Sequence, residues 1–362
     1  STTRCVSPYH LQAVVEAPVG QGRVVLFGFP VQHRGQSLAT FIPFVAIGFL
    51  LGAVVGAGIA GLSCATVLQA AGHRVRVFDK SGGTSGRMST RRGEGWQCDH
   101  GAQFFTVREP SFREHVEEWL RHGVVREWCT GFEGSDGHPR YRGVHAMTDI
   151  PKYLAHGLSV RYDSLAFSVQ RGTATKWSLS LDTGEMIPAD AVITTCPTPQ
   201  SYSLTITTDL DIPEELISLD YDRTICLLAV VDRPIDLGAH GARQQPCASV
   251  SFAADNSAKG ISAVPALTMH ADAEWSLSHW DSSTEELTAR LTELAAPLLG
   301  SSRILESNVK KWRFATPRTI WPERCLALDG IVFAGDAFGG PRVEGAVLSG
   351  AAAAQAVSES LS

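Results

Sequence analysis

Three glycines with the spacing G-x-G-x-x-G lie at Gly56, Gly58 and Gly61, and an acidic residue, Asp79, follows eighteen positions after the last glycine. Between a strand and a helix, the first glycine permits a tight turn and the second lets the backbone approach a pyrophosphate without a Cβ in the way. The third lets the helix pack closely on the strand, and the helix N-terminus favours the phosphate charge. Asp79 would accept hydrogen bonds from a ribose hydroxyl. The pattern predicts a dinucleotide site; an ordinary glycine turn followed by a solvated Asp79 is the alternative.

A second acidic residue, Asp336, closes the segment Ile331–Asp336 (IVFAGD), and a glycine-rich turn follows it. A dinucleotide extends beyond the site that one mononucleotide-binding unit provides, so it needs a second set of contacts. Asp336 would supply one of them at the ribityl chain of a flavin. A helix beginning near Val343–Ala346 would place its positive end under the pyrimidine edge of the ring, where negative charge develops on reduction. These residues favour FAD over NAD; a solvated Asp336 at a helix N-cap is the alternative.

The elements that must position these residues are visible in the apolar pattern. Leu51–Val55 is an apolar run that ends at the glycine loop, as a buried strand should. Ile59–Ala71 has the apolar spacing of a buried helix, and Gly72 lies where a C′ glycine is expected. His73–Asp79 alternates apolar and polar residues, which is typical of a strand. The three segments predict a βαβ unit.

Helical and strand patterns continue to alternate along the chain, with no internal repeat. One predicted helix has apolar residues at helical spacing in a charged segment, which is typical of a surface helix. A later predicted helix opens with a capping box. The predicted elements are the helix around Phe112, Val116, Trp119 and Leu120, a hairpin from Trp177–Leu181, buried strands at Asp190–Thr195 and Ile225–Val231, a helix opened by Ser283 and Glu286 and closed by Gly300, a strand at Ile331–Ala334 and an Ala-rich helix at Val343–Val357.

The apolar stretch Phe41–Val55 allows two interpretations, a membrane helix or signal anchor and the first strand of the flavin fold. The glycine loop needs Leu51–Val55 as its strand, which leaves Phe41–Leu50. As a helix, that segment would span roughly 15 Å against a hydrocarbon core of about 30 Å. We favour the strand, and we treat residues 1–50 as an atypical N-terminal extension.

The composition excludes several classes of protein. The 362 residues are 44% hydrophobic and 19% charged, an ordinary globular balance, and the net charge of −6 argues against a nucleic-acid partner. Eight cysteines stand apart without a C-x-x-C pair, which indicates reduced thiols in a cytoplasmic protein. Neither a zinc-binding spacing nor a G-x-S-x-G elbow is present, so a zinc enzyme and an α/β-hydrolase are disfavoured. The expected metal content is none.

Several further motifs occur in a specific order from Leu51 to the C-terminus, and with them the chain resembles the bacterial renalase-like branch of the flavin amine oxidase superfamily. The resemblance implies an α/β two-domain fold of the para-hydroxybenzoate-hydroxylase type: a Rossmann-type FAD-binding domain with a smaller antiparallel-sheet substrate domain. It also implies non-covalent FAD and the oxidation of 2- or 6-dihydro isomers of NAD(P) by oxygen. The motifs are Asp79-Lys80-Ser81, Gly86-Arg87-Met88-Ser89-Thr90, the segment from Asp99 to Thr106 (DHGAQFFT), Trp312-Arg313-Phe314-Ala315, Gly335-Asp336 and the segment from Arg342 to Ala346 (RVEGA).

The residues expected to bind the cofactor come from both ends of the chain. One departure from the family pattern concerns the loop after the second strand, where R-G-x-G-G-R is replaced by the segment from Gly82 to Arg87 (GGTSGR). One phosphate contact is therefore in question, at Gly82 and Ser85. The cofactor-binding candidates are Gly56, Gly58, Ile59, Ala60, Gly61, Asp79, Lys80, Gly86, Arg87, Met88, Gln103, Ala166, Gly335, Asp336, Arg342, Val343, Glu344 and Ala346.

The substrate side offers polar and aromatic residues in segments that should approach the flavin. Gln103, His270, Trp275 and Arg313 are the candidates, with Trp280 as a further aromatic. Each also has a structural interpretation: core or lid tryptophans, a strand histidine with its hydrogen bonds satisfied, and an amide that binds backbone. Oxidation of a dihydropyridine needs no strong general base, since the protein mainly has to stack and orient the ring.

We expect the FAD-binding domain to comprise residues 51–108, 146–200 and 310–362, and the substrate domain to comprise 109–145 and 201–309. The expected partners are a dihydronicotinamide dinucleotide and oxygen. Two alternatives stay open: a flavin amine oxidase or desaturase-type enzyme, and a flavin-binding protein without turnover.

Overall fold

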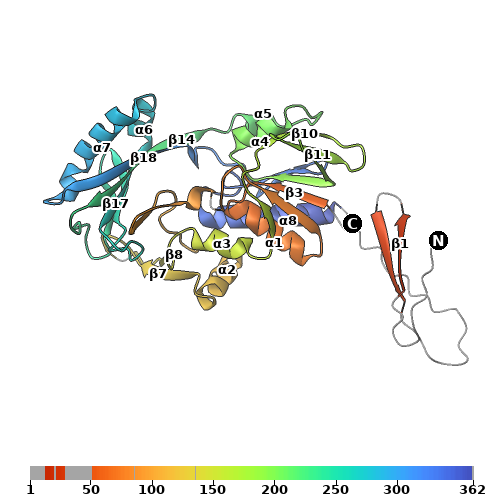
Figure 1. Ribbon diagram of the computed structural model, residues 1–362, viewed down its shortest axis with the longest axis horizontal. Helices are drawn as coiled ribbons and strands as arrows, with labels where there is room; N and C mark the ends of the chain where they lie inside the picture. The colour runs from red at the N-terminus through yellow and green to blue at the C-terminus, as the bar shows by residue number, and fades with distance from the viewer. Residues whose placement is uncertain (1–12, 20–21, 29–50, 85, 135, 361–362) are drawn as a thin grey trace, which may run out of the picture.

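The computed structural model describes residues 13–19, 22–28, 51–84, 86–134 and 136–360 (Figure 1). Ser85 and the apolar segment 41–50 lie outside the described residues. Of the first fifty residues, only the backbone of an antiparallel pair is described, β1 (Ala13–Val19) with β2 (Gly22–Gly28).

A six-stranded sheet in the order β19-β20-β13-β3-β4-β9 forms the centre of the first half of the fold. All neighbours are parallel except β19, which runs antiparallel to β20. Their bounds are β3 (Leu51–Val55), β4 (Arg74–Phe78), β9 (Ser159–Arg161), β13 (Ala191–Thr194), β19 (Leu326–Leu328) and β20 (Ile331–Phe333).

Alternate side chains of this sheet enter two different cores. Val54 packs with helices α1 (Ile59–Ala70) and α8 (Val343–Glu359) on one face. Its neighbour Ala53 packs on the other face with a three-stranded sheet, β10 (Ala166–Arg171), β11 (Trp177–Leu181) and β12 (Met186–Ala189). Both faces are covered, as a parallel sheet requires.

The predicted βαβ unit is confirmed. Helix α1 begins at Ile59 and ends at Ala70, Gly72 has a φ of +88° just beyond it, and β4 follows. Helix α8 lies close against α1 because Gly350 has no side chain: a Cβ there would lie 2.1 Å from the Ala60 carbonyl oxygen. The last helix of the chain therefore covers the first helix of the fold (Figure 1).

The second half of the fold is a five-stranded antiparallel sheet in the order β15-β16-β17-β14-β18. Helices α6 (Ala273–Ser278) and α7 (Thr284–Leu299) cover one face, and α7 opens with the predicted capping box of Ser283 and Glu286. The strands are β14 (Tyr221–Val231), β15 (Ala242–Cys247), β16 (Val250–Asp255), β17 (Ala266–Ala271) and β18 (Ile304–Pro317).

Short elements connect the two halves. They are the 3-10 turn η1 (Gly86–Met88), the hairpin β5 (Thr90–Gly93) and β6 (Trp96–Asp99), helix α2 (Pro110–Arg121), the hairpin β7 (Val125–Cys129) and β8 (Arg140–Gly143), and helices α3 (Asp149–Ala155), α4 (Thr198–Thr205) and α5 (Glu214–Ile217).

The predicted fold class, a Rossmann-type parallel sheet combined with an antiparallel sheet, is confirmed. The exact domain limits stay a prediction. Within the described residues, no helix combines the length and apolar character needed to cross a bilayer.

Candidate active site

The glycine loop after β3 is shaped by close backbone contacts. Gly56 has a φ of +107° and donates its N–H to the Phe78 carbonyl oxygen at 2.8 Å. A Cβ on Gly61 would lie 2.0 Å from the Gly56 carbonyl oxygen, so this position must be glycine for the helix to start where it does. Asp79 accepts the N–H of Ala57 at 2.6 Å and that of Ser81 at 2.8 Å. The carboxylate therefore lies directly beside the loop, as the fingerprint predicts.

The second loop of the site begins in η1, where Gly86 has a φ of +52°. It approaches the first loop closely, since a Cβ on Gly86 would lie 3.3 Å from the Cα of Gly58. Among the described residues, a Cβ on Gly58 would have only the Gly86 Cα within 4.0 Å. The space over Gly58 is open to a ligand, and any side chain at that position would enter it.

Arg87 joins this loop to the far end of the chain. Its guanidinium donates two hydrogen bonds to the two carboxylate oxygens of Asp336, each at 2.5 Å. The side chains are 28% and 14% exposed, so the pair is largely sheltered from water. Asp336 is held after β20 by Gly335, which has a φ of +133° and donates its N–H to the Ser349 hydroxyl at 2.8 Å.

Two helices point their N-termini into this region, and neither is capped by a side chain among the described residues. The N-cap of α1 is Gly58 and the N-cap of α8 is Arg342. Backbone N–H groups in a first helical turn are the donors that bind phosphate and other anionic groups. The glycine cradle, Asp79, the Arg87–Asp336 pair and these two helix ends fit a flavin dinucleotide.

The other cofactor candidates divide by exposure. Lys80 and Arg342 are exposed, whereas Ala166, the first residue of β10, is buried in the core. Glu344 is buried at 4% exposure, and one carboxylate oxygen accepts the N–H groups of Arg108 and Glu109, each at 2.8 Å. Glu344 thus anchors the chain just before α2. The remaining candidates, Ile59, Ala60, Met88, Val343 and Ala346, are buried at or below the two loops.

Gln103 lies in the segment 99–104, which packs on the Arg87 loop. Ala102 donates its N–H to the Arg87 carbonyl oxygen at 2.8 Å, and a Cβ on Gly101 would lie 1.9 Å from that oxygen. The Gln103 amide is 5% exposed and donates to the Asp99 carbonyl oxygen at 2.7 Å. Gln103 is therefore beside the predicted flavin loop, with its amide already engaged by protein groups.

His270 lies on β17, opposite Cys226 of β14, and faces the same segment. Cys226 contacts the His100 carbonyl oxygen from that face of the sheet. Burial lowers the pKa of the His270 imidazole to about 4, with smaller contributions from His100 and Lys259. Its Nε2 has no hydrogen-bond partner in the described part of the chain. His270 is thus an uncharged imidazole on the sheet face toward the flavin loop.

His100 was not among the predicted site residues. Its ring stacks on Trp312 with centroids 5.3 Å apart, and the Trp312 indole N–H donates to the His100 carbonyl oxygen at 2.7 Å. Burial, aided by the Lys310 ammonium, lowers the pKa of His100 to about 4. The His100 Nδ1 finds no partner within the described residues. The motif that includes Arg313 thus contributes Trp312 to this wall, whereas Arg313 itself is exposed and lies over the Phe314 ring.

The two tryptophan candidates lie on the other side of the antiparallel sheet. Trp275 and Trp280 pack in the cluster that contains Met269 and Ala271, the residues on either side of His270. Successive side chains of a strand point to opposite faces, so the structure does not bring Trp275 together with His270. Trp275 instead stacks on His279, with ring centroids 4.2 Å apart.

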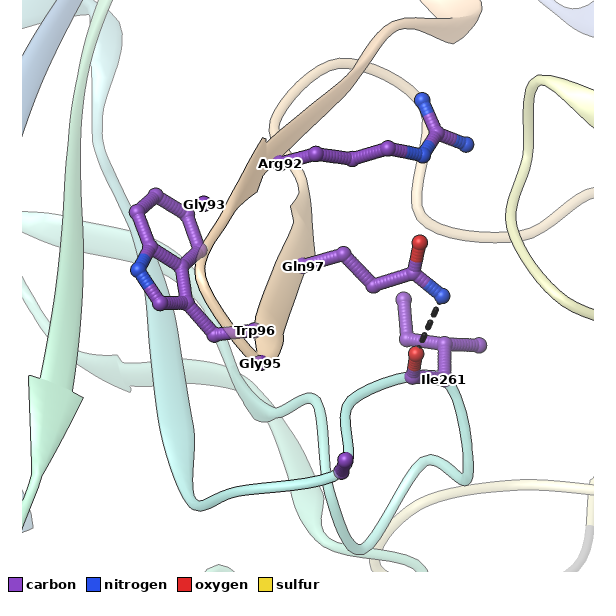
Figure 2. A pocket seen from close by; sticks show the side chains of 7 residues that line it. Arg92, Gly93, Gly95, Trp96, Gln97 and Ile261 are labelled. Atoms are coloured by element: carbon purple, nitrogen blue, oxygen red, sulfur yellow. Dashed lines mark hydrogen bonds between the residues drawn. The ribbon is translucent and has the colours of Figure 1, made fainter.

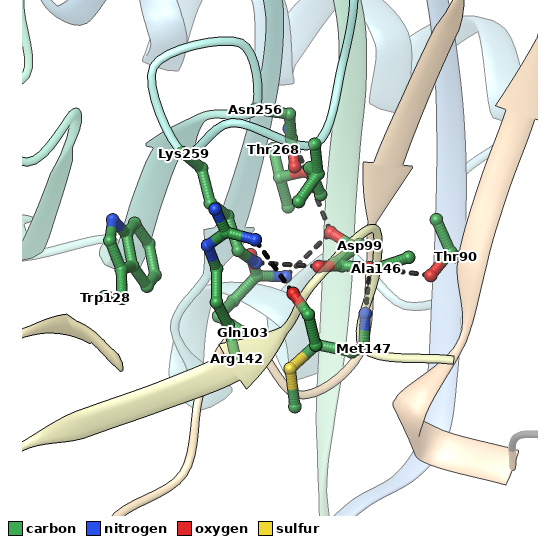
Figure 3. A network of polar contacts seen from close by, with 12 residues as sticks. Thr90, Asp99, Gln103, Trp128, Arg142, Ala146, Met147, Asn256, Lys259 and Thr268 are labelled. Atoms are coloured by element: carbon green, nitrogen blue, oxygen red, sulfur yellow. Dashed lines mark hydrogen bonds and ion pairs between the residues drawn. The ribbon is translucent and has the colours of Figure 1, made fainter. Parts of the chain in front are cut away.

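Lys259 is a second residue that sequence reasoning missed (Figure 3). It lies between β16 and β17, and its ammonium donates to Asp99 at 2.8 Å and to Gln103 at 3.2 Å. The side chains of Lys259 and Asp99 are both 0% exposed. The sequence offered a signal for this ion pair, because the segment from Asp99 to Gln103 carries an acidic residue within a motif that must be buried.

A surface pocket lies away from this wall, between the β5–β6 turn and the loop after β16 (Figure 2). Gln97 closes one side by donating to the Ile261 carbonyl oxygen. The pocket contains none of the predicted site residues, and its lining is Arg92, Gly93, Gly95, Trp96, Gln97, Ile261 and Ala263.

Comparison with known proteins places the chain in a family. Residues 54–122 match the NAD(P)-binding Rossmann-like domain, and residues 117–358 match the flavin containing amine oxidoreductase family. Mouse renalase is 30% identical over 165 residues, which cover 42% of this chain and 48% of renalase. An L-amino-acid oxidase from Siganus canaliculatus is 49% identical over 62 residues, 17% of this chain and 12% of that protein.

The chain therefore matches about half of renalase and a smaller part of the amino-acid oxidase. Among solved structures, a putrescine oxidase variant superimposes with a TM-score of 0.64 at 14% identity, covering 86% of this chain and 99% of its own. That likeness shows a shared fold. Since one family model spans most of the chain, the protein belongs to the flavin-containing amine oxidoreductases and is a flavin-dependent oxidoreductase.

Proposed function

We propose that the protein is an FAD-dependent oxidase that takes a hydride from 2- or 6-dihydro isomers of NAD(P) and gives the electrons to oxygen, forming hydrogen peroxide. FAD is supported by the two acids of the cradle, Asp79 beside the glycine loop and Asp336, which Arg87 joins to the second loop of the site. Non-covalent binding is what the resemblance implies. When bound, the flavin accepts the hydride and returns two electrons to oxygen.

The observation that carries the substrate class is the chemistry of the wall beside the Arg87 loop. It presents two uncharged imidazoles, His100 and His270, and the indole of Trp312. The charged groups that shift the pKa of His100 are Lys310, Asp99 and Arg91, and the one that shifts the pKa of His270 is Lys259, which is paired with Asp99. Such a wall suits a flat, uncharged ring carried by an anionic dinucleotide, and its three side chains include no carboxylate to pair with the ammonium group of an amine.

The chain's own residues would act by placing the ring. The segment 99–104 is fixed to the flavin loop through Ala102 and Arg87, and Trp312 holds its position from β18. Hydride transfer requires the donor carbon within about 3–3.5 Å of the acceptor, so one placement of the ring selects among the isomers. No base has to remove a proton from the substrate carbon.

Anaerobic stopped-flow measurement of flavin bleaching tests the proposal. The 2- and 6-dihydro isomers should reduce the flavin quickly and ordinary 4-dihydro NADH slowly, and admitted oxygen should then yield hydrogen peroxide. Bleaching by benzylamine or putrescine, with the dihydronicotinamides inactive, would establish the amine oxidase alternative suggested by the names of its relatives. A flavin that stays oxidised with every donor would identify a flavin-binding protein without turnover.

A further inference from the structure

Lys259 connects the two halves of the fold through a buried ion pair. Its loop is closed on β16, where its backbone N–H donates to the Asp255 carbonyl oxygen at 2.8 Å. From there its side chain crosses to Asp99, at the end of β6. The Lys259 ammonium lies 5.0 Å from the centroid of the Trp128 ring.

All three oxygen atoms of Asp99 accept a hydrogen bond or an ion pair. One carboxylate oxygen accepts the Thr90 hydroxyl at 2.6 Å and the Met147 N–H at 3.0 Å, and the other accepts Lys259 (Figure 3). Its carbonyl oxygen accepts the Thr268 hydroxyl of β17 at 2.9 Å. A buried network in which every oxygen of Asp99 is bonded favours one arrangement of its members over others.

A buried ion pair is a weak source of stability, because the desolvation of both ions offsets their attraction and an apolar pair would often do better. What this pair supplies is position. Lys259 also donates to the Gln103 amide oxygen, so it holds both ends of the turn that carries His100. The same turn is joined to the flavin loop, where His100 donates its N–H to Ser89 and Ala102 donates to Arg87.

We infer that Lys259 is a positioning residue: through Asp99 and Gln103 it fixes the His100 turn between the flavin loop and the His270 face of the antiparallel sheet. This deepens the proposed function, because it identifies what sets the geometry of the ring-binding wall. The Lys259 ammonium contacts Asp99, Gln103 and the Trp128 ring, and it acts through the groups it holds.

The two charges of the ion pair shift the pKa values of His270 and His100 in opposite directions. Lys259 lowers the pKa of His270, together with burial and His100. Asp99 raises the pKa of His100 against burial, Lys310 and Arg91. Loss of the ion pair should therefore raise the pKa of His270 and lower that of His100.

The test uses the flavin-loaded protein and three variants. Lys259→Met alone strands a buried carboxylate, so it should lose soluble, yellow protein. Lys259→Met/Asp99→Asn removes both charges and keeps the oxygen that accepts Thr90 and Met147, so it should fold and retain flavin. The control Lys176→Met breaks an exposed ion pair with Asp329 and should behave as the wild type.

In the double variant we expect flavin reduction by the preferred dihydronicotinamide to slow by roughly 10- to 100-fold. The NMR titrations of His270 and His100 should shift in the opposite directions just given. Wild-type reduction rates with unmoved histidine titrations would overturn the inference and leave only a charge pair that aids folding. If no dihydronicotinamide reduces the wild type, the proposed function fails, and the titrations alone decide the role of Lys259.

A double variant that does not fold would be replaced by Gln103→Leu, which keeps the ion pair but removes the second contact of the ammonium together with the hydrogen bonds that the Gln103 amide donates to the Asp99 and Gly101 carbonyl oxygens. It should slow flavin reduction and shift the His100 titration while the protein still folds and retains flavin. An unchanged rate and titration in that variant would likewise overturn the inference.

Discussion

Arg87 and Asp336 form a bidentate ion pair although 249 positions separate them in the chain. One belongs to the loop after the second strand of the βαβ unit, and the other follows the last parallel strand. A planar guanidinium and a carboxylate in this geometry fix each other's orientation as well as their distance. The pair therefore ties together the two segments that the sequence assigns to one cofactor.

Arg87→Ala should weaken flavin binding by roughly 10- to 100-fold, since charge-assisted hydrogen bonds to Asp336 would be lost from a sheltered site. The flavin-to-protein ratio after gel filtration, followed by titration of the stripped protein with FAD, measures the effect. Arg171→Ala is the matched control, because Arg171 pairs with Asp209 and Asp329 on the exposed surface. Equal flavin retention in both variants would contradict the assigned role.

Gly58→Ala and Gly61→Ala should fail in different ways. At Gly58 the new methyl group would meet little protein, so the variant should fold and lose flavin because the side chain occupies pyrophosphate space. At Gly61 the methyl group would lie 2.0 Å from a carbonyl oxygen, so the fold itself should be destabilised, by about 1–3 kcal/mol. Melting temperature and flavin content, measured together, separate the two results. Full flavin in Gly58→Ala would tell against this loop.

The elements around the glycine loop could be predicted from the sequence more completely than those of the wall beside the flavin loop, for a physical reason. The βαβ unit is local: a strand, a glycine turn and a helix lie within thirty residues, and each carries its own pattern. The α1, β4 and capping-box predictions were confirmed to within one or two residues. The wall beside the flavin loop is instead assembled from β6, β17 and β18, which meet only through long-range pairing.

That difference explains why the structure places the substrate-side candidates on different faces. The pattern around β17 gave no register, so nothing distinguished His270, which faces the flavin loop, from Trp275, which packs on the opposite side. In the same way, the sequence led to Arg313 as a candidate, whereas its neighbour Trp312 makes the contact with the His100 carbonyl oxygen. A shift of one residue along a strand moves a side chain to the other face.

FAD should be released intact when the yellow protein is precipitated with acid or heat. The expectation follows from the family resemblance, and the predicted contacts of Asp79, Arg87 and Asp336 are all hydrogen bonds or ion pairs. Absorbance of the supernatant and of the pellet, with identification of the released flavin by mass spectrometry, gives the answer. Colour retained in the pellet would show a covalent link.

Deletion of residues 1–48 should leave flavin content and solubility unchanged. The described parallel sheet begins at Leu51, whose N–H is already satisfied by the Asp190 carboxylate at 2.9 Å. We expect the flavin fold to need nothing before that strand. Flavin content and elution volume of the truncated protein should match those of the full chain. Aggregation of the truncated form, or recovery of the full chain with membranes, would favour an anchor in the segment 41–50.

Stability should fall as the pH is lowered from about 6.5 to about 4, through the two buried histidines. Above an ordinary histidine pKa of 6.5 both imidazoles are neutral whether the chain is folded or unfolded, so they add no pH dependence. Below that pH the two histidines bind protons in the unfolded chain, whereas in the folded protein they stay neutral until the pH approaches their pKa of about 4. For His100 this difference amounts to roughly 3 kcal/mol.

Urea unfolding at pH 7, 6, 5 and 4 measures this loss, and His100→Gln/His270→Gln should flatten the curve over that range because glutamine does not titrate. Carboxylates that titrate near pH 4 act equally in both proteins, so the difference between the two curves isolates the histidines. A variant with the wild-type slope would show that both imidazoles are protonated freely in the folded protein. The wall beside the flavin loop would then carry positive charge at mildly acidic pH, and an uncharged ring would no longer be its natural ligand.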